Sequence, residues 1–255
     1  MSALSLAPVF LPRLPRIAFA SDSPQFARVI RLVLFDIDGT LLHTGGAGIK
    51  AFGMAIAHEF GVHDGPERLK FAGRTDVSLV REAFTNHGIE PSRANFDRFF
   101  AVYLSFLRKV IVECHGGTCR GVLEFHQALL AQPKPPLLGL LTGNIKQGAQ
   151  IKLERYQMWD KFVFGAFADD HEERDQIAAV AHRRGSERLG GALRGEEVLV
   201  VGDTPLDIRC GRAIGAKVLA VASGGATLEE LRPHRPDWAV ADLSQISAAE
   251  VLDGA

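Results

Sequence analysis

An apolar run that ends in two aspartates constrains this chain more than any other feature. Residues 33–42 read Val-Leu-Phe-Asp-Ile-Asp-Gly-Thr-Leu-Leu. The apolar residues predict a strand that is buried on both faces and ends near Asp36, and Gly39 allows a sharp turn close to a ligand. Because unpaired buried charge is costly, Asp36 and Asp38 are poor core residues. The pair fits a site that holds a divalent cation and a nucleophile; the plainer interpretation is a turn, which Asp and Gly also favour.

The composition narrows the class of protein. Hydrophobic residues make up 47% and charged residues 23% of 255 residues, which is typical of a globular protein with a full core. The net charge of −1 gives no long-range field for nucleic acid or an anionic membrane, so we expect neither as a partner. No apolar run reaches the roughly 18 residues that span a bilayer. Oligomeric state is not readable from the sequence.

The cysteines and the N-terminal residues bear on location. Three cysteines (Cys114, Cys119 and Cys210) are too few for a disulfide framework and lack the partners for a four-ligand metal site. We therefore expect reduced thiols and a cytoplasmic location.

Residues 1–30 begin with a proline-containing stretch that has no continuous apolar segment. This predicts an irregular N-terminal extension, with a transit or export signal as the alternative.

The pattern of apolar residues changes twice along the chain. Between 45 and 116 they recur at helical spacing, and glycine pairs flank this segment. The spacing predicts helices over 47–60, 76–88 and 92–113. We expect this segment to be a helical domain inserted into an α/β core domain formed by 31–44 and 117–255.

Strands and helices alternate in the rest of the chain. Strands are expected within 31–42 and at 136–142, 161–167, 197–202, 216–221 and 237–240. Helices are expected at 120–131, 145–156, 172–185 and 205–214. This order predicts a doubly wound parallel sheet of the Rossmann type, whose ligands bind at the carboxyl ends of the strands.

Two further segments should meet Asp36 and Asp38 at that edge of the sheet. Thr142, Gly143 and Asn144 follow the strand at 136–141 and offer a hydroxyl, a backbone N–H and an amide to a phosphoryl oxygen. The same three residues are also an ordinary helix N-cap sequence.

Residues 200–207 form the second segment, Val-Val-Gly-Asp-Thr-Pro-Leu-Asp. The strand delivers Asp203 at its end as a ligand suited to Mg²⁺. Asp207 lies one turn further, where it can reach a metal through water, hold a lysine, or simply complement the helix dipole.

Taken together, these segments resemble the motifs of the haloacid-dehalogenase superfamily of phosphohydrolases. The resemblance covers residues 31–241, with the helical segment where the cap of that family falls. It implies that Asp36 attacks phosphorus as the nucleophile and that Asp38 acts as general acid and base. It also implies that Mg²⁺ is held by Asp36, Asp38 and Asp203, with Asp207 nearby.

The resemblance also bears on the lysine that holds the transferred phosphoryl group. Many members carry it in a Lys-Pro pair, but the matching stretch here, 169–175, has none. Relatives without that pair place the lysine on the helix after the Thr-Gly-Asn motif, which matches Lys152 and its apolar neighbours. Lys146 is the second candidate, and a solvated helix lysine is the plain alternative.

Gly73-Arg74-Thr75-Asp76 is similar to a cap segment that faces the active site in relatives. The resemblance gives Arg74 a role in binding a carboxylate or phosphate of the substrate. Asp76 is expected only to cap the helix that follows it in the sequence.

The function implied is Mg²⁺-dependent hydrolysis of a small phosphorylated metabolite through an aspartyl-phosphate intermediate. An acid at position 38 favours phosphate esters over halides and phosphonates, and the helical cap resembles those of phosphoglycolate phosphatase and its relatives. A phosphomutase of the β-phosphoglucomutase type uses the same groups and is the first alternative. The second is a binding protein that retains the fold without catalysis.

Overall fold

A computed structural model describes residues 29–252, so the prediction for the N-terminal extension lies almost wholly outside the described residues. Six parallel strands form one sheet in the order β5-β4-β1-β6-β7-β8. Their bounds are β1 Leu32–Phe35, β4 Leu137–Leu141, β5 Gly165–Ala166, β6 Val198–Gly202, β7 Lys217–Val221 and β8 Trp238–Val240. The predicted parallel α/β fold is confirmed.

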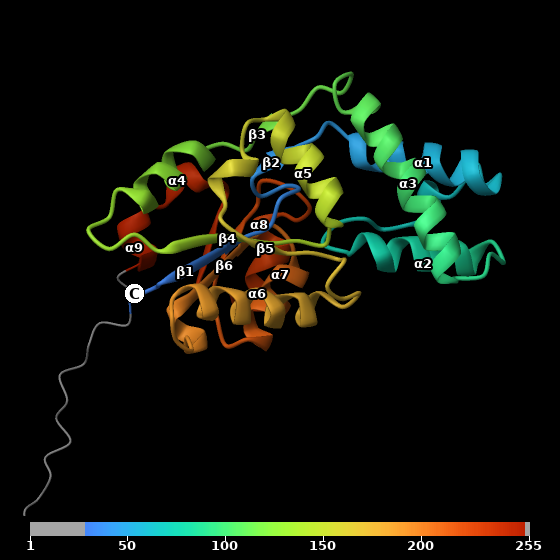
Figure 1. The fold of residues 1–255 in the computed structure, drawn as a ribbon. Helices are drawn as coiled ribbons and strands as arrows, with labels where there is room; N and C mark the ends of the chain where they lie inside the picture. The colour runs from blue at the N-terminus through green and yellow to red at the C-terminus, as the bar shows by residue number, and fades with distance from the viewer. Residues whose placement is uncertain (1–28, 253–255) are drawn as a thin grey trace, which may run out of the picture.

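Helices cover both faces of this sheet because both faces are apolar (Figure 1). On β1, Val33 and Phe35 pack with the helices on one face, whereas Leu32 and Leu34 pack with those on the other. The first face carries α4 (Val122–Leu130), α5 (Lys146–Arg155) and α9 (Ala248–Leu252), and the second carries α6 (Arg174–Arg188), α7 (Pro205–Ala213) and α8 (Leu228–Leu231). The strand ends are thus fixed from both sides.

Residues 45–116, called the insertion below, are helical as predicted. Its helices are α1 (Ala47–Phe60), α2 (Asp76–Asn86) and α3 (Arg93–Val110), which lie together beside the sheet in Figure 1. They share an aromatic core of their own, in which Phe84 and Phe99 are fully buried. At the base of the insertion, β2 (Leu42–His43) and β3 (Gly117–Thr118) form a two-stranded antiparallel sheet. This pairing joins the two ends of the insertion.

The first strand ends at Phe35, next to Asp36 as predicted, because the chain then turns and the carbonyl of Ile37 accepts hydrogen bonds from the backbone N–H groups of residues 40–42. The prediction of a strand over 161–167 is wrong for most of that range. A 3₁₀ turn occupies Trp159–Lys161, and only Gly165–Ala166 pair with the sheet. This segment lies at the sheet edge, where apolar side chains can pack without a complete ladder.

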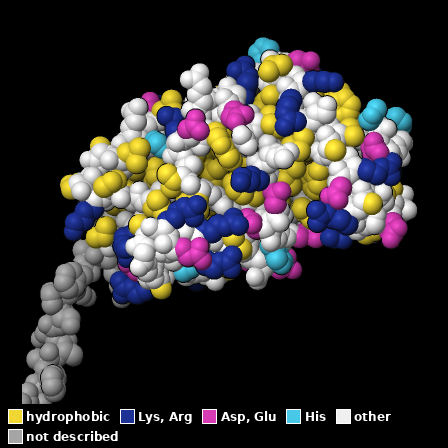
Figure 2. Space-filling view, in the orientation of Figure 1, with side chains coloured by type: hydrophobic (Ala, Val, Ile, Leu, Met, Phe, Trp, Pro, Cys, Tyr) yellow, Lys and Arg dark blue, Asp and Glu magenta, His cyan; other side chains and the backbone are white. Residues whose placement is uncertain are grey.

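Charged side chains of both signs are interspersed on the face shown in Figure 2, in keeping with the net charge of −1. Among residues 29–252, the structure contains no helix with the length and hydrophobicity needed to cross a membrane.

Candidate active site

Asp36 lies at the carboxyl end of β1, in the middle of the sheet. Its side chain is buried, whereas that of Asp38 remains partly open to solvent. Between them and Leu42 the chain turns through Gly39, whose φ of +80° is accessible mainly to glycine. A Cβ on Gly39 would lie 2.3 Å from Oδ2 of Asp203. Glycine is therefore required here both for the turn and for the close approach of the next strand end.

Asp203 follows β6 directly and meets Asp36 and Asp207 in a buried cluster of carboxylates. One carboxylate oxygen from each of the three lies within 4.8 Å of the others. Thr40 donates its hydroxyl to Oδ1 of Asp203 at 3.2 Å, and the backbone N–H of Gly225 donates to Oδ2. Three acids so close together repel one another unless a proton or a cation compensates them.

The burial and close approach of these carboxyl groups raise the pKa values of two of them. Burial raises the pKa of Asp36 to about 6, although Arg174 acts in the opposite direction. Burial, together with the charges of Asp207 and Asp36, raises the pKa of Asp203 to about 8. A divalent cation would relieve this cost, and hard carboxylate oxygens are the ligands that Mg²⁺ prefers. The donor set therefore fits the predicted metal.

Asp207 differs from the other two acids of the cluster. Its Oδ1 pairs with Arg174, and its Oδ2 accepts the backbone N–H and the hydroxyl of Thr204 at 3.0 and 2.7 Å. Both oxygens are thus engaged, which suits a residue that supports the metal ligands. Of the roles weighed for Asp207, the helix-start acid is seen, because Asp207 forms a capping box with Thr204 in the first turn of α7. It also holds a cation, but this is Arg174 and not a lysine.

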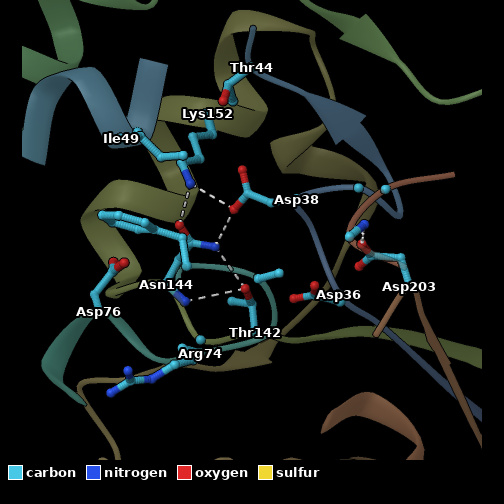
Figure 3. A pocket seen from close by; sticks show the side chains of 18 of the residues that line it. Asp36, Asp38, Thr44, Ile49, Arg74, Asp76, Thr142, Asn144, Lys152 and Asp203 are labelled. Atoms are coloured by element: carbon cyan, nitrogen blue, oxygen red, sulfur yellow. Dashed lines mark hydrogen bonds and ion pairs between the residues drawn. The ribbon is translucent and has the colours of Figure 1, made fainter. Parts of the chain in front are cut away.

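Lys152 lies at the centre of a second network, above Asp36 (Figure 3). Its Nζ donates to Oδ2 of Asp38 at 2.7 Å and to Oδ1 of Asn144 at 2.6 Å. Burial opposes the charge of Lys152, but the carboxylates of Asp38 and Asp76 more than offset this and raise its pKa. Lys146, by contrast, is exposed on the first turn of α5. The structure therefore brings Lys152 to the site and not Lys146.

The Thr-Gly-Asn segment follows β4 and reaches the same network. Asn144 donates its amide to Oδ2 of Asp38 at 2.8 Å and to the hydroxyl of Thr142 at 2.9 Å. Gly143 lies against the insertion, since a Cβ there would be 2.3 Å from the carbonyl oxygen of Arg74. The predicted phosphoryl donors thus contact Asp38 and line the same cavity as Asp36.

The insertion contacts the site through residues 73–76. The backbone N–H of Asp76 donates to the carbonyl of Gly143 at 2.7 Å, and its carboxylate accepts the N–H of Ile145 at 2.8 Å. Asp76 thus caps α5 of the core, and the prediction that it caps its own helix is wrong, because Thr75 does so. Long-range capping of this kind leaves no local trace in the sequence.

Arg74 borders the cavity, but its guanidinium points away from the aspartates in Figure 3. It forms an ion pair with Glu82 and a 3.3 Å hydrogen bond to Ser78, both on α2. The substrate-binding role expected for Arg74 therefore remains a prediction, and its present partners belong to the insertion itself.

Arg174 is the site residue that the sequence reasoning missed. Its guanidinium is buried, 3.0 Å from Oδ1 of Asp36, and also pairs with Asp207 and donates to the carbonyl of Gly73 at 3.1 Å. Its Nε has no hydrogen-bond partner among the described residues. An unpaired buried donor destabilises the folded protein, so its presence indicates a functional role for Arg174. One signal was available: Arg174 is the only basic side chain, histidine apart, in the stretch that lacks the Lys-Pro pair.

Comparisons with known proteins agree with this geometry. The model of the haloacid dehalogenase-like hydrolase family matches residues 33–221. The pyrophosphatase PpaX of Anoxybacillus flavithermus is 26% identical, over 85% of this chain and 95% of that protein. Among solved structures, CbbY from Rhodobacter sphaeroides in complex with phosphate covers 88% of this chain and 99% of its own, at 18% identity and a TM-score of 0.68. A predicted phosphoglycolate phosphatase from Haemophilus somnus covers 85% and 96%, at 19% identity and a TM-score of 0.64.

The chain belongs to the haloacid dehalogenase-like hydrolases. It is therefore an enzyme, and the solved structures show that it shares the fold of that family.

Proposed function

We propose that this hydrolase is a Mg²⁺-dependent phosphatase that acts on a small phosphate monoester through an aspartyl-phosphate on Asp36. The observation that carries the proposal is the convergence of two unlike carboxylates. Asp36 is buried and paired with Arg174, whereas Asp38 is partly open and within hydrogen-bond distance of Lys152. A fixed nucleophile beside an accessible acid is what a two-step displacement at phosphorus requires.

In the first step, a carboxylate oxygen of Asp36 bonds to phosphorus, and the bond from phosphorus to the ester oxygen breaks. Asp38 gives its proton to the departing alkoxide. In the second step, Asp38 takes a proton from water, whose oxygen attacks phosphorus and releases Asp36 and inorganic phosphate. Thr142, Asn144 and Lys152 would hold the phosphoryl oxygens, together with the backbone N–H of Gly143.

Mg²⁺ would lie against Asp36 and Asp203, with the backbone carbonyl of Asp38 as the third protein ligand and Asp207 supporting them. When bound, it neutralises charge on the phosphoryl oxygens.

We also propose that residues 45–116 act as a cap over the core formed by 31–44 and 117–255. The free thiols of all three cysteines suit a reducing, cytoplasmic location.

The test is release of inorganic phosphate from a panel of small phosphate esters, with Mg²⁺ and with EDTA. Turnover only with Mg²⁺ supports the proposal. Isomerised product in place of inorganic phosphate would favour the phosphomutase alternative, which uses the same groups. Binding of esters without either product would favour the non-catalytic alternative.

The raised pKa values of two acids predict how Mg²⁺ binding depends on pH. The metal must displace protons from Asp36 and Asp203, whose pKa values are about 6 and about 8 without metal. Protonated carboxyl groups do not ligate, so affinity should fall as pH falls. We expect the apparent dissociation constant for Mg²⁺ to rise about tenfold or more from pH 8 to pH 6. Calorimetric titration at both values checks this, and equal affinities would contradict it.

The network around Asp38 predicts different roles for the two candidate lysines. Lys152→Met keeps the apolar stem but removes the cation beside Asp38 and Asn144, so kcat should fall by about 10²–10³-fold. Lys146→Met is the matched control on the same helix, and its exposed side chain predicts a change of no more than about twofold. Steady-state kinetics on both variants decide the matter. A larger loss in the Lys146 variant would reassign the phosphate-binding lysine.

A further inference from the structure

The cavity between core and insertion has two chemically different walls. It holds about 390 Å³, a volume suited to a small ligand. The core wall carries the aspartates and the phosphoryl donors described above. The insertion wall presents the large apolar and aromatic side chains of Ile49, Phe52, Phe71, Leu79 and Tyr103, with Arg74, Asp76 and several small residues between them. With phosphorus beside Asp36, the leaving group of the ester must face this second wall.

The cations around the cavity are already engaged. Lys152 pairs with Asp38 at 2.7 Å, and Arg174 pairs with Asp36 at 3.0 Å. The remaining guanidinium, that of Arg74, is held by Glu82. Among the described lining residues the only other basic group is the exposed imidazole of His43 on β2.

Negative charge, by contrast, is plentiful on the cavity walls. Asp76 lines the cavity from the insertion, and Asp38 from the core. The amino-terminal end of α1, at Gly46 and Gly48, favours an anion, but a helix terminus carries only about half a positive charge. The ionised carboxylates that border the same cavity only accept hydrogen bonds, so they offer no donor to a second anion. A second anionic group on the substrate would therefore meet repulsion and apolar side chains.

We propose that the substrate is a phosphate monoester whose leaving group is uncharged and largely apolar, and that the Arg74–Glu82 ion pair excludes esters with a second anionic group. This inference rests on the proposed phosphatase function and names the substrate class of that same site. It disfavours phosphoglycolate, pyrophosphate and sugar bisphosphates.

The test compares phosphate esters that differ in one charge, using the full chain with Mg²⁺. Ethyl phosphate and phosphoglycolate form one pair, since a methyl group replaces the carboxylate. Benzyl phosphate and 4-carboxybenzyl phosphate form a larger pair, and inorganic pyrophosphate adds a different second anion. We expect kcat/KM to be at least about tenfold higher for the neutral member of each pair. Equal values, or a preference for the charged members or pyrophosphate, would overturn the inference.

Glu82→Ala tests the role of the ion pair. Loss of Glu82 releases Arg74, whose backbone already lies against Gly143, to turn toward the cavity. We expect kcat/KM for phosphoglycolate to rise at least about threefold, while that for ethyl phosphate stays within about twofold. Glu113→Ala is the control, because it removes another ion pair of the insertion, with the exposed Lys50. If the ratio of kcat/KM for phosphoglycolate to that for ethyl phosphate were unchanged in the Glu82 variant, the Arg74–Glu82 ion pair would not determine specificity.

The outcomes separate the two proposals. If no ester is hydrolysed with Mg²⁺, the phosphatase function fails and the substrate class fails with it. If esters are hydrolysed but the charged members are preferred, the phosphatase function stands and only the inference about the leaving group is wrong.

Discussion

Asp36→Asn should abolish turnover while the fold remains intact. The amide keeps the shape of the side chain but cannot attack phosphorus, and loss of a covalent nucleophile lowers kcat by about 10⁴-fold or more. The effect on stability should be small, because burial already raises the pKa of Asp36 to about 6 and so disfavours its charged form. We expect the unfolding midpoint in EDTA to change by no more than about 4 °C.

Two measurements make this prediction specific to the nucleophile. Rapid-quench experiments with labelled ester should trap label on the wild-type protein and none on the Asn variant. Asp175→Asn is the matched control, since Asp175 lies one residue from Arg174 but pairs with Arg209 on α7. Its activity should stay within about twofold of wild type. If the Asp36 variant retained a tenth of wild-type activity, the nucleophile would have to be another group.

Most of the site could be predicted because it is built from strand ends. Asp36, Thr142 and Asp203 each follow a strand that is buried on both faces, and the carboxyl ends of parallel strands meet at one edge of the sheet. Apolar runs are the strongest signal in a single sequence, so the order of strands and the residues after them were accessible. Lys152 was accessible through the family resemblance, which places the lysine on the helix after the Thr-Gly-Asn motif, and its apolar neighbours agree with a buried helix face.

The remainder depends on contacts that no local pattern encodes. Arg174 stands in a strongly polar stretch, which resembles a solvated helix start unless its distant partners are known, namely Asp36 after β1 and Asp207 on α7. Asp76 caps a helix about seventy residues away, which depends on how the insertion docks against the core. The direction of the Arg74 side chain is likewise set by its ion pair with Glu82, which the Gly-Arg-Thr-Asp sequence alone does not predict.

Arg174→Gln should lower the free energy of unfolding by about 3–5 kcal/mol in EDTA, because it leaves two buried carboxylates without their cation. Arg183→Gln is the matched control on the same helix. Its ion pair with Glu187 is exposed, with 65% of each side chain accessible. Loss of this exposed pair should cost about 1 kcal/mol or less. Urea unfolding of both variants and the wild type gives the comparison, and equal losses would show that Arg174 is not a special support of the site.

The deficit of the Arg174 variant should also grow with pH. A carboxyl group whose folded pKa lies above its unfolded value holds its proton more tightly when folded, so stability falls as pH rises through the folded pKa. For Asp36 the folded pKa is about 6, against an ordinary value of 3.8, and it is Arg174 that keeps it from rising further. Without Arg174 the fall in stability continues above pH 6, so the difference from wild type should be larger at pH 8 than at pH 6. A deficit that shrank over this range would mean that the guanidinium does not stabilise ionised Asp36.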